Sequence, residues 1–543
     1  MKKNVIWVLP WFGVAAAVQR TNGADFSSQT FDYVVVGGGT AGLTVAARLS
    51  EDPKVSVGVI EAGPYFENDP LVDTPGLAGQ LPGNPKYDWM FSSVPQRHVN
   101  NRVLPMPRGK ALGGSSAINL MALDRASKTE YDAWEDLGNP KWNWNGAALW
   151  FVLEPVPNFT SLEFLPYMKA AERFTGIDPF KANATGAGPD DIFPSQGTDG
   201  TITASFNTWY SDIVVPFREA MANRGVPINF DPDSGDPFGL YNSATAVNRT
   251  TGTRSYAAST YFAYNSGRAN FVVLTGAQAT KIEFKSPTTG KYGGRLTATG
   301  VSFVHDSTTY TVKARKEVIL SAGTFQTPHL LELSGIGNAT ILRQNGIAPL
   351  VDLPGVGENL QEHILVPSTY ELKPGITTID ILRNNASYAA AAQAQYAATH
   401  DGIYSYSTST LSFINLDYIV NPEELSSMLE RLDREVADEE ISALQKAQYQ
   451  IQKDWLKKRH INSTDPLVAP QIDPNYFSKS IGTAALAPKE IGGVVDTSLK
   501  VYGTSNVRVA DASVIPIHIG THISRTVYGI GERLAAIITN NSS

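Results

Sequence analysis

The sequence predicts an α/β fold in which two domains are interleaved along the chain. Its 543 residues exceed what a single hydrophobic core usually supports, so two domains are expected. Between residues 31 and 60 a strand, a glycine turn, a helix and a second strand follow one another, which is the order of a βαβ unit. Further strand-like segments are spread over the whole chain, so each domain is expected to be assembled from separate stretches.

The βαβ unit is predicted from the hydrophobic pattern. Phe31–Val36 is a short apolar run rich in β-branched residues, as in a buried strand, and it ends in three consecutive glycines. From Thr40 to Ser50 apolar residues recur at helical spacing, and Val55–Ile60 again resembles a strand. Later strands are predicted at Phe271–Leu274, Lys281–Phe284, Thr297–Phe303 and Val318–Leu320, and one or two surface helices at Pro422–Lys458.

The glycine turn indicates a dinucleotide site. Gly37, Gly39 and Gly42 form GxGxxG between the first strand and the helix, where a tight turn must bring the backbone close to a pyrophosphate at the helix N-terminus. Glu61 follows nineteen residues after Gly42, at the end of the second strand, where a carboxylate can accept hydrogen bonds from a ribose diol. These residues by themselves leave FAD and NAD open.

Composition and charge exclude several classes of function. A net charge of -8 and the lack of a dense Lys/Arg run argue against nucleic acid as a partner. The chain has no cysteine, which excludes thiol catalysis and cysteine-based metal sites. The GxSxG motif of hydrolases does not occur around Ser115 and Ser116, so a nucleophilic serine is not expected.

The N-terminus predicts secretion. Lys2 and Lys3 precede a short apolar run, so residues 1–18 are interpreted as a signal peptide and the mature protein as extracellular or cell-wall located. The run is too short to span a bilayer, which needs about 20 apolar residues, and no membrane span is expected after cleavage. Glycosylation triplets, which fit this route, begin at Asn158, Asn183, Asn248, Asn338, Asn385, Asn462, Asn540 and Asn541. The sequence indicates no oligomeric state.

Four longer motifs carry a family resemblance. Arg108–Asn119 reads RGKALGGSSAIN and Gly323–Gly337 reads GTFQTPHLLELSGIG, and they resemble the two signatures of glucose–methanol–choline (GMC) oxidoreductases. Leu353–His363 and Tyr502–Glu532 resemble the turn and the C-terminal block that follow in that family. Among its members the chain looks most like fungal aryl-alcohol oxidases and the dehydrogenases of secondary metabolism.

The resemblance implies a fold and a cofactor. The fold is a Rossmann-like FAD-binding domain interleaved with an α+β substrate domain built on an antiparallel sheet. The FAD-binding segments would be about 31–125, 225–345 and 495–540, and the substrate domain about 126–224 and 346–494. The cofactor would be FAD rather than NAD, and the mechanism metal-free. The substrate would be a small-molecule alcohol, with electrons passing on to oxygen or another acceptor.

The residues expected to hold FAD follow from these motifs. The turn at residues 113–116 can offer backbone N–H groups and hydroxyls to the pyrophosphate or flavin, although its serines could simply cap a following helix. By resemblance, Asp511 and Ala512 lie beside the phosphates. The predicted cofactor-binding residues are Gly37, Gly39, Thr40, Ala41, Gly42, Glu61, Ala62, Arg108, Gly113, Gly114, Ser115, Ser116, Asn119, Leu120, Met121, Ala122, Asp511, Ala512 and Ile523.

His522 is the predicted catalytic residue. It lies in HIGTHISRTVYGIGERL, which resembles the segment that carries the family's second catalytic histidine into the last helix. Oxidising an alcohol requires a group that takes the hydroxyl proton, and histidine, with an ordinary pKa near 6.5, is suited to it. His518 is four residues earlier and could share a zinc ion with His522 on a helix, but Pro516 and the lack of a third ligand argue against a metal.

The chain departs from the family at the other active-site histidine. That residue should stand three positions before Gly482, where the sequence has Lys479. The surrounding residues predict a deletion between Ser478 and Ile481, a second gap near 460–462 and an insertion at 147–164. Wrongly joined exons are the favoured explanation, and a divergent protein is the alternative. The leading function is FAD-dependent alcohol oxidation; a non-redox cyclase on the same scaffold and an inactive flavin-binding protein remain open.

Overall fold

A computed structural model describes most of the chain. The described residues are 21–144, 164–176, 193–285, 295–363, 370–407, 410–438, 441–458 and 479–540. The predicted signal peptide, the second gap near 460–462 and the insertion up to residue 163 lie outside them. In the described part of the chain, no helix is both long and apolar enough to cross a membrane.

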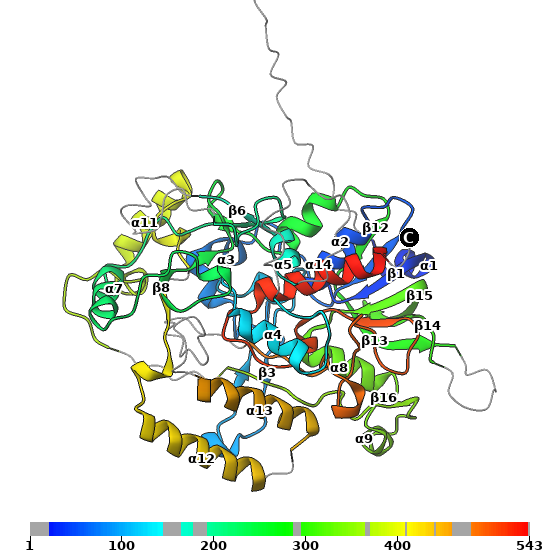
Figure 1. The fold of residues 1–543 in the computed structure, drawn as a ribbon. Coiled ribbons are helices and arrows are strands. Elements are labelled where there is room, and N and C mark those ends of the chain that lie inside the picture. Colours follow the sequence, from blue (N-terminus) through cyan, green and yellow to red (C-terminus); the bar gives the residue numbers. More distant parts are fainter. Residues whose placement is uncertain are drawn as a thin grey trace, which may run out of the picture.

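One seven-stranded mixed sheet organises the molecule (Figure 1). Its strands are β1 (Thr30–Val36), β2 (Val57–Ile60), β12 (Phe271–Leu274), β13 (Ala277–Phe284), β14 (Ala298–His305), β15 (Thr308–Leu320) and β19 (Val507–Val509). The order is β12-β2-β1-β15-β14-β13, with β19 paired to the end of β15. β12, β2, β1, β15 and β19 run parallel, whereas β13 and β14 pair antiparallel, so the predicted parallel βαβ unit forms the centre of the sheet.

The register of the parallel strands creates the site. Val36 at the end of β1 is paired with both Ile60 and Leu320, and Leu320 is paired with Val509. The carboxyl ends of four strands therefore meet at one edge of the sheet, which is where ligands bind in open α/β sheets. The residues that follow these strands, in the turns after β1, β2, β15 and β19, are brought together there.

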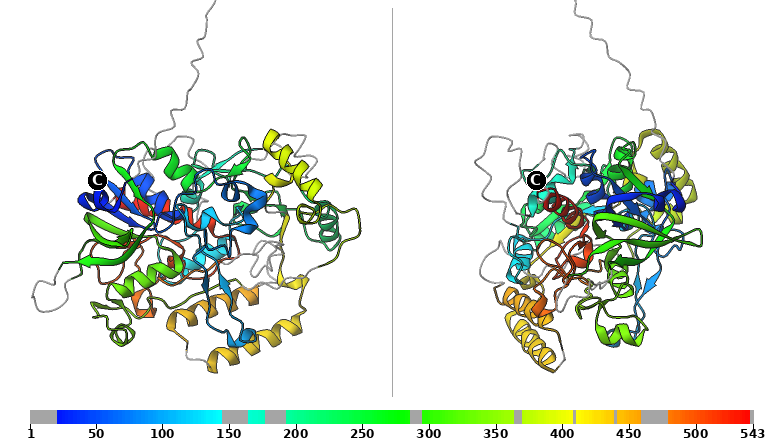
Figure 2. Two further views of the ribbon diagram at one scale, coloured as in Figure 1. Left: turned by 180° about the vertical axis from the view of Figure 1, so that it is seen from behind. Right: turned by 90° about the vertical axis from the view of Figure 1, so that its right-hand side faces the viewer.

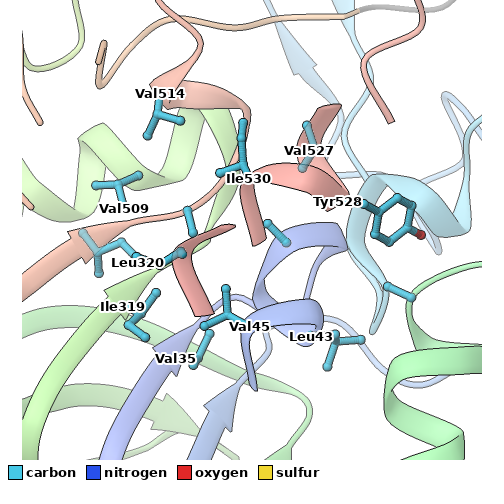
Figure 3. Close-up of a cluster of buried hydrophobic side chains, with 14 of the residues drawn as sticks. Val35, Leu43, Val45, Ile319, Leu320, Val509, Val514, Val527, Tyr528 and Ile530 are labelled. Carbon is cyan, nitrogen blue, oxygen red and sulfur yellow. The ribbon is translucent and has the colours of Figure 1, made fainter. Parts of the chain in front are cut away.

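Two helices from opposite ends of the chain cover the sheet beside this edge. α2 (Thr40–Leu49) and α14 (Ser524–Asn540) are the blue and red helices that lie together in Figure 1. Their close approach depends on Gly531, because a Cβ there would lie 3.0 Å from the Ala41 carbonyl oxygen. Figure 3 shows the core beneath them, formed by Val35, Leu43, Val45, Ile319, Leu320, Val509, Val514, Val527, Tyr528 and Ile530.

The rest of the described chain consists of short strand pairs and helices. The pairs are β3 (Phe91–Ser92) with β4 (Pro105–Met106), β5 (Ala122–Leu123) with β9 (Ala244–Thr245), β6 (Glu172–Phe174) with β7 (Ile202–Ala204), β8 (Gly239–Asn242) with β18 (Thr410–Phe413), β10 (Val247–Asn248) with β11 (Thr253–Arg254), and β16 (Ile336–Gly337) with β17 (Val351–Asp352). The helices are α1 (Gly23–Ser28), α3 (Pro70–Asp73), α4 (Lys128–Asp136), α5 (Leu165–Ala170), α7 (Val214–Asn223), α8 (Gly323–Leu333), α9 (Ala339–Gln344), α10 (Ile381–Asn384), α11 (Ala386–Thr399), α12 (Pro422–Asp438) and α13 (Ala443–Lys458).

The predicted surface helices are confirmed as α12 and α13, which lie side by side at the periphery (Figure 2). α12 is mostly exposed, whereas α13 buries Leu444 and Trp455. Gln448 of α13 donates to the carbonyl oxygen of Pro516 over 2.6 Å. The pair is thereby attached to the segment that leads into α14.

Two contacts connect distant parts of the chain near α14. Gln361 and Ile481 form an antiparallel bridge, with N–H···O distances of 3.2 and 3.0 Å. Arg125 and Arg525 both pair with the buried Glu172, at 2.7 and 2.6 Å. The paired guanidinium and carboxylate groups offset one another's burial and hold the first turn of α14 in place.

Candidate active site

A cavity of about 290 Å³ lies at the carboxyl-end edge of the sheet. It is lined by the turn after β1, residues 108–109, 114–116 and 119–122, part of β13, the start of α8, and segments around 479, 511 and 522. The predicted residues that line it are Gly37, Gly39, Thr40, Ala41, Glu61, Ala62, Arg108, Gly114, Ser115, Ser116, Asn119, Leu120, Met121, Ala122, Asp511, Ala512, His522 and Ile523. Gly42 and Gly113 do not line it.

Two glycine turns pack backbone against backbone at one end of the cavity. Gly37 has φ +100°, and a Cβ on Gly42 would lie 2.0 Å from the Gly37 carbonyl oxygen. Gly113 donates its N–H to the Gly38 carbonyl over 2.7 Å, and a Cβ on Gly114 would lie 2.7 Å from the Gly39 Cα. Gly42 and Gly113 therefore act by allowing this close packing, which explains why they lie behind the cavity wall.

The N-terminus of α2 opens on this end of the cavity. Gly39 is the N-cap residue and supplies no side-chain cap, while Thr40 and Ala41 line the cavity. The first N–H groups of a helix lack partners within the helix and carry the positive end of its dipole. This terminus is therefore suited to a phosphate group.

Glu61 stands at the end of β2 with its carboxylate held by backbone groups. Its two oxygens accept the N–H groups of Gly38 and Gly63, at 2.8 and 2.7 Å. Burial raises the pKa of Glu61 to about 7, although both N–H groups favour the carboxylate form. A ribose diol that donates to this carboxylate would favour the ionised form further.

Replacing Glu61 by glutamine is expected to weaken FAD binding by about 10- to 100-fold, because a hydrogen bond to a charged group is worth roughly 1.5–3 kcal/mol. In the wild type, hydroxyl donors lower the pKa of the carboxyl below its value of about 7 in the FAD-free protein. Affinity should therefore rise as pH increases to about 7 and level off above it. Fluorescence titration of the apoprotein with FAD measures both effects; a flat wild-type profile, or equal affinity of the glutamine variant, contradicts the expectation.

The GGSS turn continues into a short 3-10 helix, Gly114–Ala117, so its serines lie inside a helical turn rather than before a longer helix. Ser115 Oγ accepts the Gly109 N–H at 3.2 Å, and Ser116 Oγ donates to the Gly113 carbonyl at 2.6 Å. Asn119 then donates to the Ser524 hydroxyl at 3.0 Å. This segment thus connects the glycine turns to the first residue of α14.

Asp511 organises the opposite wall. Its carboxylate accepts from the Gly323 N–H at 2.9 Å and the Thr327 hydroxyl at 2.6 Å, both in α8, and from the backbone and side chain of Ser513. Burial raises the pKa of Asp511, and these donors oppose the rise. With both oxygens engaged, Asp511 fixes the segment that contains Ala512 against the start of α8.

His522 lies two residues before α14 and lines the cavity. Its Nδ1 is 3.1 Å from each carboxylate oxygen of Asp124, and its backbone N–H donates to Asp124 Oδ1 at 3.0 Å. Asp124 is 1% exposed. Burial alone would raise the pKa of Asp124, but His522 and Lys479 lower it below its ordinary value. A carboxylate therefore faces the imidazole.

Lys479, which the sequence predicts in place of the family's other histidine, lines the cavity. Its backbone N–H donates to Glu362, and its carbonyl accepts from His518 Nε2 at 3.1 Å. His518 stacks on His363 with ring centroids 3.7 Å apart, and burial lowers the pKa of His518 to about 4. His518 and His522 both precede α14 and do not lie on one helix. They therefore do not form the i, i+4 helical pair that could have shared a zinc ion. Within the described residues, no group of three His, Cys, Asp or Glu side chains could hold a metal ion.

Sequence reasoning missed part of the cavity. Ser321–Gln326 and residues 277–280 line it, as do Trp89 and Phe91. Ser321–Gln326 overlaps the second family signature, so the motif was a usable signal, whereas nothing in the local pattern marked the two aromatic residues. Asp124 was missed although it follows the predicted stretch 119–122 by two residues, because only the fold brings it to His522.

These residues fit FAD. Two touching glycine turns, a helix N-terminus and a buried carboxylate surround one cavity, and its volume is close to the lower end of small-molecule sites. A side chain at Gly39 would lie beside the Gly114 Cα, where the two turns meet. The cavity also extends from the glycine turns to His522, which suits a long dinucleotide.

Comparisons with known proteins identify the family. Residues 31–365 and 478–531 match two models of the family described as GMC oxidoreductase. A dehydrogenase from Armillaria gallica is 33% identical, with 95% of this chain and 94% of the relative covered. The structure of an FAD-dependent oxidoreductase from Chaetomium thermophilum is 27% identical with a TM-score of 0.78, covering 94% of this chain and all of that one. A fungal aryl-alcohol oxidase, 24% identical with a TM-score of 0.76 over 95% of this chain and all of its own, has the same fold.

The comparison with the Armillaria gallica dehydrogenase also concerns the predicted losses. The alignment runs over 623 positions, 80 more than the 543 residues of the chain. That relative therefore carries stretches without a counterpart here. The predicted cofactor and fold are confirmed by the family match and by the FAD-dependent neighbour. The chain belongs to the GMC oxidoreductase family, and its cofactor is FAD.

Proposed function

We propose that the protein oxidises the CH–OH group of a small alcohol, with His522 as the base that takes the hydroxyl proton. The observation that carries the proposal is the position of His522 in the same cavity as the phosphate-binding turns, with its ring held by Asp124. With a neutral ring protonated on Nδ1, the basic atom is Nε2. A base of this type contributes about 10²- to 10⁴-fold in rate.

Different residues of the chain have different roles in the proposed oxidation. Bound FAD supplies the acceptor for the hydride that leaves the carbinol carbon as the carbonyl forms. His522 Nε2 receives the hydroxyl proton, so the developing alkoxide is not left charged. Lys479 lies in the same cavity and would bring a positive charge toward that oxygen. Burial of Asp124 keeps water from competing for Nδ1.

The experiment is anaerobic reduction. Purified protein should be yellow and should lose its flavin absorbance when a substrate alcohol from a panel of benzylic, sugar-derived and polyketide-derived compounds is added. Re-oxidation by oxygen or by an artificial acceptor then separates an oxidase from a dehydrogenase. Turnover without bleaching would favour the non-redox cyclase, and a yellow protein that turns over no alcohol would favour an inactive flavin-binding protein.

We also propose that the gene from which this sequence derives joins exons wrongly at three places: between Ser478 and Ile481, near residues 460–462, and at the extra segment 147–164. The aligned stretches missing here support the proposal, as does the departure from the family pattern at Lys479. The flavin-binding motifs are intact, which a protein freed from catalysis would have little reason to retain. Sequencing the expressed transcript tests it: a message that contains these junctions contradicts the proposal and favours a divergent protein.

A role outside the cell is the last part of the proposal. The charged and apolar residues of 1–18 and the glycosylation triplets support secretion. Asn338 and Asn385, two of the acceptor residues, stand at the N-terminal ends of α9 and α11. Recovery from culture medium of a protein that begins near residue 19, with a mass lowered by endoglycosidase, is the expected result. By resemblance, the substrate would belong to fungal secondary metabolism.

A further inference from the structure

Asp124 is a buried carboxylate that no described motif accounts for. It follows β5, whose residues Ala122 and Leu123 pair with Thr245 and Ala244 of β9. The strand pair fixes the backbone at this point, so the carboxylate is delivered to His522 from a rigid element. His522 is 398 positions away in the sequence.

Asp124 contacts both the backbone and the ring of His522. Oδ1 accepts the backbone N–H of His522 at 3.0 Å, which by itself would only hold the turn before α14. Both carboxylate oxygens also lie 3.1 Å from Nδ1 of the ring, so the carboxylate faces the imidazole with both oxygens. Because an ionised carboxylate has no proton to give, the ring must donate, and its proton is held on Nδ1.

We propose that Asp124 is a positioning residue for alcohol oxidation: it orients the His522 ring, keeps its basic nitrogen at Nε2 and stabilises the imidazolium formed when that nitrogen takes the proton. This inference rests on the proposed function. Among the described residues, Lys479, Arg525 and His363 also act electrostatically on the pair. Lys479 and Arg525 are positive and oppose protonation of the ring, so the carboxylate is the group that favours it.

The Asp124→Asn variant distinguishes a role in positioning the His522 ring from a purely structural role. It keeps the size of the side chain and an oxygen that can accept the His522 backbone N–H, but it loses the negative charge. Its amide can also donate to Nδ1, which moves the ring proton to Nε2 and removes the base. A residue that only holds the turn would tolerate this change.

Glu130→Gln is the matched control. Glu130 is a half-buried carboxylate beside the same segment: it accepts the Gly520 N–H at 2.6 Å, two residues before His522, and the backbone N–H and hydroxyl of Ser127. Burial raises the pKa of Glu130, while the donors from Gly520 and Ser127 oppose the rise. The control therefore measures the effect of removing a carboxylate beside this turn while His522 keeps its partner Asp124.

The experiment measures three properties of the holoproteins. Flavin content should be equal in wild type, Asp124→Asn and Glu130→Gln. The rate of anaerobic flavin reduction should fall by about 10²- to 10⁴-fold in Asp124→Asn only, and its acidic limb should move down by about one pH unit or more. In histidine-labelled holoprotein, the NMR titration midpoint of the ring assigned by loss in His522→Gln should shift in the same direction.

The outcomes are distinguishable. Asp124→Asn with a wild-type rate profile and an unmoved imidazole titration overturns the inference, as does an equal loss in Glu130→Gln. If no alcohol reduces the wild-type flavin, the proposed function fails, while the imidazole titration still decides whether Asp124 controls the ring of His522.

Discussion

Alanine in place of His522 is expected to slow anaerobic flavin reduction by about 10²- to 10⁴-fold, the usual contribution of a positioned general base. Among the described residues that line the cavity, His522 and His329 carry imidazole rings. The His329 ring pairs with Gln326 of the same helix, whereas the His522 ring is held by Asp124. The measurement is stopped-flow bleaching of the flavin at saturating alcohol.

His305→Ala is the control for this variant. His305 ends β14 opposite Ala277 of β13, and it is not among the described residues that line the cavity. Its rate should stay within about twofold of wild type, since changes far from the reacting groups rarely alter the barrier. Equal rates for His522→Ala and wild type would remove His522 from the chemistry, whereas loss of FAD from His522→Ala would mean that the residue supports cofactor binding instead.

Alanine at Gly42 is expected to abolish FAD retention. The added Cβ would lie 2.0 Å from the Gly37 carbonyl oxygen and 3.0 Å from the Ser321 Cβ. Because the first of these atoms is backbone in a turn with φ +100°, the clash cannot be relieved by a side-chain rotation. Overpacking of this kind costs about 1–3 kcal/mol or more, and here it displaces the turn that should receive the pyrophosphate.

The comparison variant is Gly79→Ala, since a Cβ at Gly79 meets nothing within 4 Å. That protein should be yellow and should unfold at the wild-type temperature. Gly42→Ala should be colourless after purification and should show a lowered unfolding temperature by circular dichroism. A yellow Gly42→Ala protein with wild-type flavin content would contradict the assignment of this turn to the cofactor.

The βαβ unit could be predicted because its signals are local. Apolar runs and glycines marked β1, α2 and β2 to within a few residues. β15 was predicted only at Val318–Leu320, whereas it begins at Thr308. Its first half exposes three Thr residues and Lys313 and pairs with β14 in an antiparallel hairpin, so its pattern lacks the continuous apolar run of a buried strand.

Some residues of the candidate site could be predicted from local sequence motifs, whereas others are brought to it only by the fold. Motif residues such as Gly39 and Asp511 could be placed in advance because a short pattern requires them. Lys479 was likewise marked by its position three residues before Gly482. Asp124 could not be placed, because its contact with His522 depends on β5. Trp89 and Phe91 reach the cavity through the fold of residues 87–110, which no periodicity marks.

The bridge between Gln361 and Ile481 has a consequence for how such proteins diversify. The backbone hydrogen bonds between Gln361 and Ile481 hold the two ends of the intervening segment together, whatever the length of that segment. Closing a chain segment becomes only about 0.6 kcal/mol more costly for each doubling of its length. A gain or loss of tens of residues between Gln361 and Ile481 therefore adds little to the free energy needed to bring the two ends of this segment together.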